Sequence, residues 1–274
     1  MLCFPNAKIN IGLYVTEKRA DGFHTIESLF YPIGLSDLLE VVEDKGKKLS
    51  QAEITVTGIK FEGDPENNLC VKAYRLLNKD IDLPPVKIHL HKCIPVGAGL
   101  GGGSSDAAYF IKLLNEKFRL DLSDEAMMNY TRKIGSDCAF FINNKPVIAT
   151  EKGDVFEDTM DKIEGSHLVL VHPRIHVSTI DAYSWIRPLK RKKSLKEEIA
   201  TGDKTKWRKN ILNDFEAPVF ERYPEIKAIK EKMYELGAYY ASMSGSGSAV
   251  YGLFDTKPNI KKSFSKYFVW EERL

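Results

Sequence analysis

Apolar and polar side chains alternate along residues 7–15. The positions that share one side are apolar: Ala7, Ile9, Ile11, Leu13 and Val15. The positions between them are Lys8, Asn10, Gly12 and Tyr14. A period of two predicts a β-strand with one buried and one exposed face, and it makes Lys8 and Asn10 neighbours on the exposed face.

The same reasoning predicts the other elements. Strands are expected over 25–33, 86–91, 140–150, 166–172 and 249–254. Helices are expected over 68–77, 104–118 and 225–236, and Ser123 with two following acids predicts the start of another. The charged stretch 187–206 predicts a mobile or weakly helical connection. Because strands outnumber a simple alternation of strand and helix, we expect an α+β protein in two lobes.

Composition narrows the class of protein. The 274 residues are 43% hydrophobic and 28% charged with a net charge of +2, which favours a globular protein and gives no bias toward nucleic acid or membrane. The sequence contains no uncharged apolar run long enough to predict a membrane span. Residues 1–10 lack the apolar core expected of a signal peptide, so none is predicted. The four cysteines, Cys3, Cys70, Cys93 and Cys138, are too widely spaced for a zinc site or disulfide framework. We therefore expect a cytoplasmic protein.

A glycine-rich segment, residues 95–108, follows the strand expected over 86–91. Five glycines fall within the seven positions 97–103, and Ser104 and Ser105 then begin the predicted helix. Glycine lets a ligand approach the main chain closely, and a helix N-terminus presents N–H groups to an anion. The segment therefore predicts a phosphate-binding loop. A flexible linker is disfavoured because periodic apolar segments flank it on both sides.

Two familiar nucleotide loops fit this segment poorly. Gly97-x-Gly99-x-x-Gly102 matches the dinucleotide fingerprint, which leaves a Rossmann oxidoreductase open as an alternative. That fold needs an acidic residue at the end of a second strand about 20 residues later, but Asp121 precedes a predicted helix. The P-loop pattern fails because no Gly-Lys-Ser/Thr closes the segment.

The loop resembles the ATP loop of the GHMP kinases, the family of galactose, homoserine, mevalonate and phosphomevalonate kinases. The matching residues are Pro95, Gly97, Gly99, Leu100, Gly101, Gly102, Gly103, Ser104 and Ser105. Further stretches resemble one branch of the family: Ala7-Lys8-Ile9-Asn10, Arg19-Ala20-Asp21-Gly22-Phe23-His24, Gly135-Ser136-Asp137, Asn213-Asp214-Phe215-Glu216 and 242–248. That branch acts on a cytidyl diphosphate derivative of methylerythritol in the non-mevalonate isoprenoid precursor pathway.

The resemblance implies a fold and an ATP site. The N-terminal lobe, 1–155, is expected to be similar to ribosomal protein S5 domain 2 and to bind ATP. The C-terminal lobe, 156–274, is expected to be ferredoxin-like, with the substrate cleft between the two. The loop residues would wrap the ATP phosphates, Ser105 would face Mg²⁺, and Asn68, Leu69 and Lys92 match positions near the adenine.

The resemblance also implies residue roles in catalysis and substrate binding. Asp137 is the expected base that accepts the proton of the acceptor hydroxyl, and Lys8 is expected to pair with it. The expected substrate-binding residues are Asn10, Phe23, His24, Thr179 and Tyr183, with Phe23, His24 and Tyr183 at the cytosine. The second glycine loop, with Gly245, Ser246 and Gly247, is expected to close over the substrate.

The implied function is ATP-dependent phosphorylation of the 2-hydroxyl of this small-molecule substrate, by a monomer or homodimer. Another GHMP kinase, of homoserine or mevalonate type, is an alternative, and so is a catalytically silent regulator with this fold. Residues 21–24 favour the cytidylated substrate, and intact Lys8 and Asp137 favour an enzyme. Three features depart from the family: Ala139 replaces a frequent proline, Tyr183 a phenylalanine of some relatives, and 187–206 has no counterpart.

Overall fold

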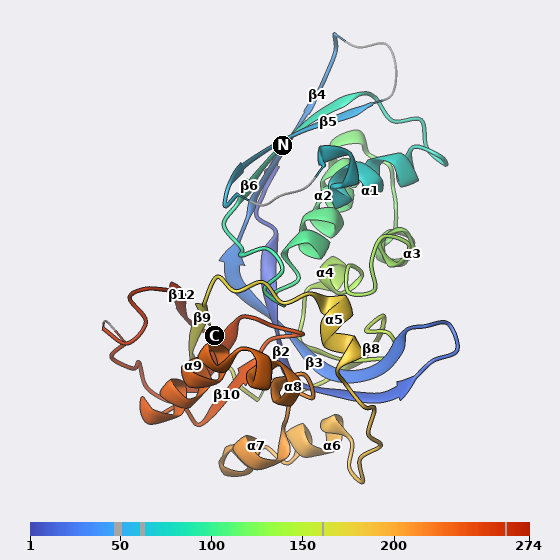
Figure 1. Ribbon diagram of the computed structural model, residues 1–274. Helices are drawn as coiled ribbons and strands as arrows, with labels where there is room; N and C mark the ends of the chain where they lie inside the picture. Colours follow the sequence, from blue (N-terminus) through green and yellow to red (C-terminus); the bar gives the residue numbers. More distant parts are fainter. Residues whose placement is uncertain (47–50, 61–63, 161, 261) are drawn as a thin grey trace. The chain divides into compact units, whose positions relative to one another are not determined.

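The computed structural model describes residues 1–46, 51–60, 64–160, 162–260 and 262–274. Two compact units make up the chain, and each is built from separated stretches. Unit 1 comprises Met1–Ala7, Gly34–Val96 and Gly101–Lys145, and unit 2 comprises Lys8–Ile33, Gly97–Leu100 and Pro146–Leu274. Each unit combines a β-sheet with helices, so the predicted α+β class is confirmed (Figure 1). Among the described residues, no helix has the length and apolar character needed to cross a bilayer.

Unit 1 is a four-stranded sheet with helices beside it (Figure 1). The strand order is β1 (Leu2–Cys3), β4 (Leu38–Glu43), β6 (Val86–Lys92) and β5 (Ala52–Gly58), with β5 parallel to β6 and the other pairs antiparallel. The helices are η1 (Pro65–Asn67), α1 (Leu69–Leu77), α2 (Gly102–Phe118), α3 (Asp124–Arg132) and α4 (Phe140–Asn143). Buried residues of β6 and α2, such as Ile88 and Phe110, form its core.

Unit 2 contains two four-stranded sheets. The first has the order β2 (Asn6–Lys18), β3 (His24–Ser36), β7 (Val147–Thr150) and β8 (Val155–Asp158), and the outer parts of β2 and β3 extend into unit 1. The second is antiparallel, with the order β10 (Tyr240–Met243), β11 (Val250–Phe254), β9 (His167–His172) and β12 (Phe268–Arg273). The helices are α5 (Thr179–Ser184), α6 (Leu195–Ala200), α7 (Lys204–Asn210), α8 (Glu216–Arg222) and α9 (Pro224–Glu235).

Most of the predicted elements are present, two expectations need correction, and a third is confirmed. The strand predicted over 140–150 is wrong in its first half, which forms α4, whereas β7 occupies 147–150. The strand over 7–15 is present as β2, but both of its faces are buried. The charged stretch 187–206 contains α6 and the start of α7, so its helical character is confirmed.

Candidate active site

The first glycine loop presents a row of unbonded amide groups. Gly97, Gly99 and Gly101 have φ angles of +66°, +79° and +69°, the left-handed region that glycine adopts without strain. Such residues alternating with ordinary ones create concave sets of N–H groups that bind anions. None of the backbone N–H groups of residues 97–104 donates a hydrogen bond to another described residue. The last three of these residues open α2, where the helix dipole also favours negative charge.

The carbonyl groups of the same loop are already occupied within unit 2. The Gly99 carbonyl accepts hydrogen bonds from Lys8 Nζ at 3.2 Å and from Ser244 Oγ at 2.8 Å. The Leu100 carbonyl accepts one from the Lys8 backbone N–H at 3.0 Å. The unused hydrogen-bonding capacity of the loop therefore lies in its donors, which suits a phosphate group.

The second glycine loop, residues 242–248, packs on the first within unit 2. A Cβ at Gly99 would lie 1.9 Å from the Ser244 carbonyl oxygen, so the two backbones touch. The Ala249 N–H donates to the Ala98 carbonyl at 3.1 Å, and Asn10 N–H donates to Ser244 Oγ at 3.2 Å. The second loop thus contacts both the phosphate-binding loop and the strand that carries Lys8.

Lys8 and Asn10 are buried, contrary to the exposed face predicted for β2. Their exposed fractions are 5% and 1%. Lys8 Nζ donates to Asn10 Oδ1 and lies 4.9 Å from the centre of the Phe30 ring. Asn10 Nδ2 in turn donates to Ser28 Oγ at 2.9 Å. A buried ammonium is costly without such partners, so they hold the Lys8 side chain at the Gly99 carbonyl.

Asp137 lies in unit 1 beside the first turn of α2. Ser104 Oγ donates a hydrogen bond of 2.7 Å to Asp137 Oδ1. A Cβ at Gly135 would lie 3.9 Å from Ser104 Oγ and 4.0 Å from Asp137 Oδ1, so Gly135 borders this pair. The carboxylate is half-buried and stands next to the unbonded amides of α2. Since Lys8 belongs to unit 2, the pairing of Lys8 with Asp137 stays a prediction.

Lys92 is buried in a cluster of charges in unit 1. Its Nζ donates to Asp106 Oδ2 at 2.7 Å and also to Asp37. Asp37 Oδ1 accepts the backbone N–H groups of residues 93 and 94, and a Cβ at Gly102 would lie 3.4 Å from Lys92 Nζ. Burial raises the pKa of Asp106 to about 7, and the nearby ammonium opposes this rise. The cluster ties β6, the start of the loop and α2 together.

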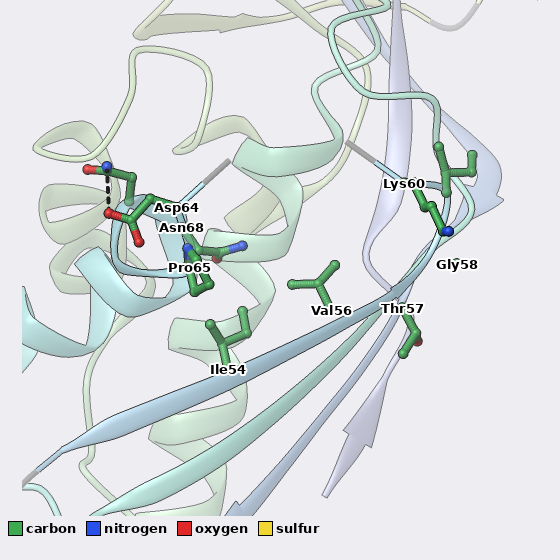
Figure 2. Close-up of a pocket in the computed structure, with 10 residues that line it drawn as sticks. Ile54, Val56, Thr57, Gly58, Lys60, Asp64, Pro65 and Asn68 are labelled. Atoms are coloured by element: carbon green, nitrogen blue, oxygen red, sulfur yellow. Dashed lines mark hydrogen bonds between the residues drawn. The ribbon is translucent and has the colours of Figure 1, made fainter. Parts of the chain in front are cut away.

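A pocket of about 690 Å³ lies between β5 and the start of α1 in unit 1 (Figure 2). Ile54 and Val56 of β5 form an apolar wall, and Asn68 stands opposite them with its side-chain oxygen accepting the Cys70 N–H at 2.9 Å. The lining residues are Ile54, Val56, Thr57, Gly58, Ile59, Lys60, Asp64, Pro65, Asn67 and Asn68. Apolar walls with a few polar groups suit a flat heteroaromatic ring.

The neighbour of Asn68 links this pocket to the phosphate-binding loop. A Cβ at Gly103 would lie 3.7 Å from Leu69 Cδ1, so Leu69 borders the first turn of α2. Two of the three residues predicted near the adenine, Asn68 and Leu69, therefore lie at or beside the pocket. Lys92 is not among its lining residues.

The residues predicted to bind substrate form two groups within unit 2. The rings of His24 and Tyr183 stack, with centres 4.7 Å apart and planes at 21°. Burial lowers the pKa of His24, which favours a neutral ring. Phe23 is 56% exposed and is therefore no core residue. Thr179 Oγ1 lies 3.1 Å from Ser246 Oγ, which joins Thr179 to the second glycine loop.

Sequence reasoning assigned no role to two buried polar residues that support the second loop. Asn213 Nδ2 donates to the carbonyls of Met243 and Gly245 at 2.8 and 2.9 Å. Glu216 Oε1 accepts the Met243 N–H at 2.9 Å. The family resemblance of the segment Asn213-Asp214-Phe215-Glu216 was the available signal, but the partners of these two side chains lie about 30 positions away along the chain.

The oxygen atoms beside the start of α2 fit a magnesium ion that is bound mainly by nucleotide phosphates. The described residues contain no cluster of three or more His, Cys, Asp or Glu side chains that could hold a metal by itself. Mg²⁺ is commonly bound through one or two protein oxygens plus phosphates and waters. Ser104 and Asp137 supply neighbouring oxygens, and Ser105 Oγ is buried without a hydrogen-bond partner in the described structure.

Known proteins match nearly the full length of the chain. The family model described as GHMP kinases N terminal domain matches residues 68–145, and that described as GHMP kinases C terminal matches 195–269. A Bacteroides fragilis protein named 4-diphosphocytidyl-2-C-methyl-D-erythritol kinase is 49% identical over 277 residues, 100% of both chains. A Cytophaga hutchinsonii protein of the same name is 49% identical over 94% of both chains. A crystal structure of 4-(cytidine 5'-diphospho)-2C-methyl-D-erythritol kinase superposes with a TM-score of 0.80 at 28% identity, covering 99% of this chain and 98% of the other.

Proposed function

The chain belongs to the GHMP kinase family, and from this premise we propose that it phosphorylates the 2-hydroxyl of 4-diphosphocytidyl-2-C-methyl-D-erythritol with ATP. The substrate is the one named in relatives that match 94 to 100% of the chain. As a small-molecule kinase, it takes its place in the non-mevalonate isoprenoid precursor pathway. A cytoplasmic location, the lobe boundary at residue 155 and a monomer or homodimer remain predictions.

One observation carries the phosphoryl-transfer part of the proposal. The amide N–H groups of eight consecutive residues, 97–104, donate to none of the described residues, while the Gly99 and Leu100 carbonyls are engaged. A loop with unsatisfied donors and satisfied acceptors is prepared for phosphate oxygens. The pocket beside Asn68 and Leu69 is the proposed adenine site, which accounts for ATP as the donor.

The proposed chemistry divides the work between a carboxylate and an ammonium. The substrate hydroxyl oxygen attacks the terminal phosphorus of ATP, and the bond from that phosphorus to the bridging oxygen breaks, so that ADP leaves. Asp137 accepts the hydroxyl proton, and the Lys8 ammonium stabilises the negative charge that develops on the attacking oxygen. Ser104 orients the carboxylate through its hydrogen bond to Oδ1. A bound Mg²⁺, which we propose is held beside Ser104, Ser105 and Asp137, would neutralise charge on the phosphates.

The proposed cytidine site is the aromatic pair of unit 2. Stacked His24 and Tyr183 offer a flat surface for a pyrimidine ring, and His24 also carries a donor and an acceptor for its edge. Phe23, which precedes His24 in the chain, is exposed enough to reach a ligand. Thr179 and Gly245, Ser246 and Gly247 of the second loop complete the proposed substrate contacts.

The decisive experiment measures ATP consumption by the purified protein with a panel of acceptors. We expect turnover with the cytidylated methylerythritol and none with homoserine or mevalonate. Turnover with either of the latter would favour the alternative family activities, and ATP binding without any turnover would favour a silent regulator. Binding of NAD(H) in place of ATP would revive the oxidoreductase interpretation.

A further inference from the structure

His176 lies against the first residue of the phosphate-binding loop within unit 2. A Cβ at Gly97 would lie 3.0 Å from His176 Nδ1 and 3.2 Å from its Cε1, so the imidazole is in contact with the Gly97 main chain. Both residues are exposed, and a ligand at the Gly97 amide can reach the ring from solvent. His176 forms no hydrogen bond or ion pair with another described residue. The imidazole therefore retains an unused donor beside unused amide donors.

The segment that carries His176 is anchored on both sides of it. Before it, the Ile175 carbonyl accepts a hydrogen bond from Ser248 Oγ of the second glycine loop. After it, Val177 is 1% exposed and belongs to the hydrophobic core of unit 2. These anchors fix the backbone, so the imidazole is held at the loop before any ligand binds.

Arg174, two positions earlier, adds a second basic group to the same segment. It is exposed, and its φ of +62° lies in the left-handed region that a residue with a side chain seldom adopts. Such strained backbone is retained where the surrounding structure imposes it, and it often accompanies ligand contacts. The segment thus presents Arg174 and His176 to solvent while Ile175 and Val177 hold it in place.

We propose that His176 donates a hydrogen bond to a phosphate group bound at the Gly97–Leu100 amides, and that it determines affinity for the phosphorylated ligand. This inference rests on the proposed kinase function, because that function gives the protein two phosphate-bearing ligands, ATP and the cytidyl diphosphate substrate. The shared chemistry is a nucleoside diphosphate group. His176 is assigned a binding role and no part in proton transfer.

Calorimetric titration with four probes tests the proposal on the intact protein. We expect His176→Ala to weaken the binding of either ADP or CDP by about 10-fold, the value of one hydrogen bond to a charged group, and to leave adenosine and cytidine unchanged. A weaker affinity for ADP assigns the His176 contact to ATP, and a weaker affinity for CDP assigns it to the acceptor substrate. His176→Gln, which keeps a side-chain donor, should recover part of the affinity.

Controls separate this proposal from a structural effect and from the kinase function itself. His167→Ala removes another histidine of unit 2, at the start of β9, and should change no affinity. If His176→Ala does not fold, the comparison uses His176→Gln and His176→Asn. Unchanged affinity for both diphosphates in a folded variant overturns the proposal. Failure of the wild-type protein to phosphorylate the cytidylated alcohol overturns the proposed function instead. The ADP titration does not depend on turnover, so it still tests the His176 contact in that case.

Discussion

Ser104 donates a hydrogen bond of 2.7 Å to Asp137 from a position 33 residues earlier in the chain. The bond uses Oδ1, whereas no described residue donates a hydrogen bond to Oδ2 of the same carboxylate. Ser104 is also the last of the residues whose amides are free. One residue of α2 therefore joins the proposed phosphate site to the proposed base.

Replacing Asp137 tests the role of this carboxylate. We expect Asp137→Asn to lower kcat by about 10³-fold, because the amide cannot accept the hydroxyl proton. Ser104→Ala should lower kcat by about 10-fold, because the carboxylate loses its orientation. Steady-state kinetics measure both. Ser123→Ala, which removes the N-cap of α3, is the matched control that should cost stability and leave kcat intact. A near-normal kcat in Asp137→Asn removes this residue from the mechanism.

Lys8 is tested by a change that keeps its buried stem. Lys8→Met preserves the apolar packing near Phe30 but removes the ammonium from the Gly99 carbonyl, so turnover should be abolished while the fold survives. Lys8→Ala should abolish turnover as well. Lys72→Met changes an exposed lysine of α1 and should leave kcat unchanged. Kinetics with a circular-dichroism melt check this prediction, and folded Lys8→Met with normal turnover would contradict it.

Two glycines of the first loop should respond differently to alanine. Outside its own helical turn, a Cβ at Gly103 lies no closer than 3.7 Å to an atom of the described residues, and alanine replaces a helical glycine. The stability of Gly103→Ala should therefore be unchanged or rise by about 1 kcal/mol. The added methyl group stands among the free amides, and we expect KM for ATP to rise about 10-fold. Gly99→Ala, at φ +79° and 1.9 Å from the Ser244 carbonyl, should lose about 3 kcal/mol of stability. Equal behaviour of the two variants in denaturation and kinetics would refute this distinction.

The stacked rings of His24 and Tyr183 predict a split between the two substrates. Tyr183→Ala should raise KM for the cytidylated substrate about 10-fold through lost stacking, with KM for ATP unchanged. Tyr183→Phe keeps the ring and should behave nearly as the wild type. His24→Ala should also raise KM for the cytidylated substrate. If both substrates are affected equally, or neither is, the cytosine site lies elsewhere.

His172 predicts a loss of stability in mild acid. Burial lowers its pKa from 6.5 to about 4, with a further contribution from Arg174. The unfolded chain therefore binds a proton that the folded protein excludes between these values. The stability is fully present above pH 6.5 and is lost as the pH falls toward 4, by about 3 kcal/mol.

The measurement for His172 is urea unfolding at a series of pH values. His172→Gln cannot titrate, so its unfolding free energy should fall less steeply between pH 6.5 and 4 than that of the wild type. The difference in slope is the readout, because the substitution itself also changes stability at every pH. Parallel curves would show that His172 is not the group responsible.

Local patterns were sufficient where an element carries its own signal. The alternation over 86–91 and the apolar spacing over 104–118 correspond to β6 and α2, and glycine content alone indicated the loop between them. The run Phe140–Asn143 was misassigned because its three consecutive apolar residues have no readable period. Its helix ends at Asn144, which adopts φ +49° and prevents a continuous strand.

Long-range partners explain what the sequence could not predict. The polar side of β2 was expected in solvent, but Tyr14 donates to the Asn210 carbonyl at 2.7 Å and Gly12 N–H donates to Tyr240 Oη at 3.2 Å. The sequence around β2 does not indicate these partners. The support given by Asn213 to the second loop was missed for the same reason. The role of its buried amide depends on the carbonyl groups of Met243 and Gly245, which lie far from it in the sequence.

The discontinuous make-up of unit 2 has a consequence for synthesis of the chain. Leu13, Val15 and Ile26 belong to the same hydrophobic core as Val169 and Val250. On the ribosome, the first strands emerge long before the segments that cover them, so this core closes only when translation is almost complete. A gene fragment that encodes only the last third of the protein would lack these strands. A chimera that takes this part from a homologous enzyme must therefore take β2 and β3 from the same enzyme.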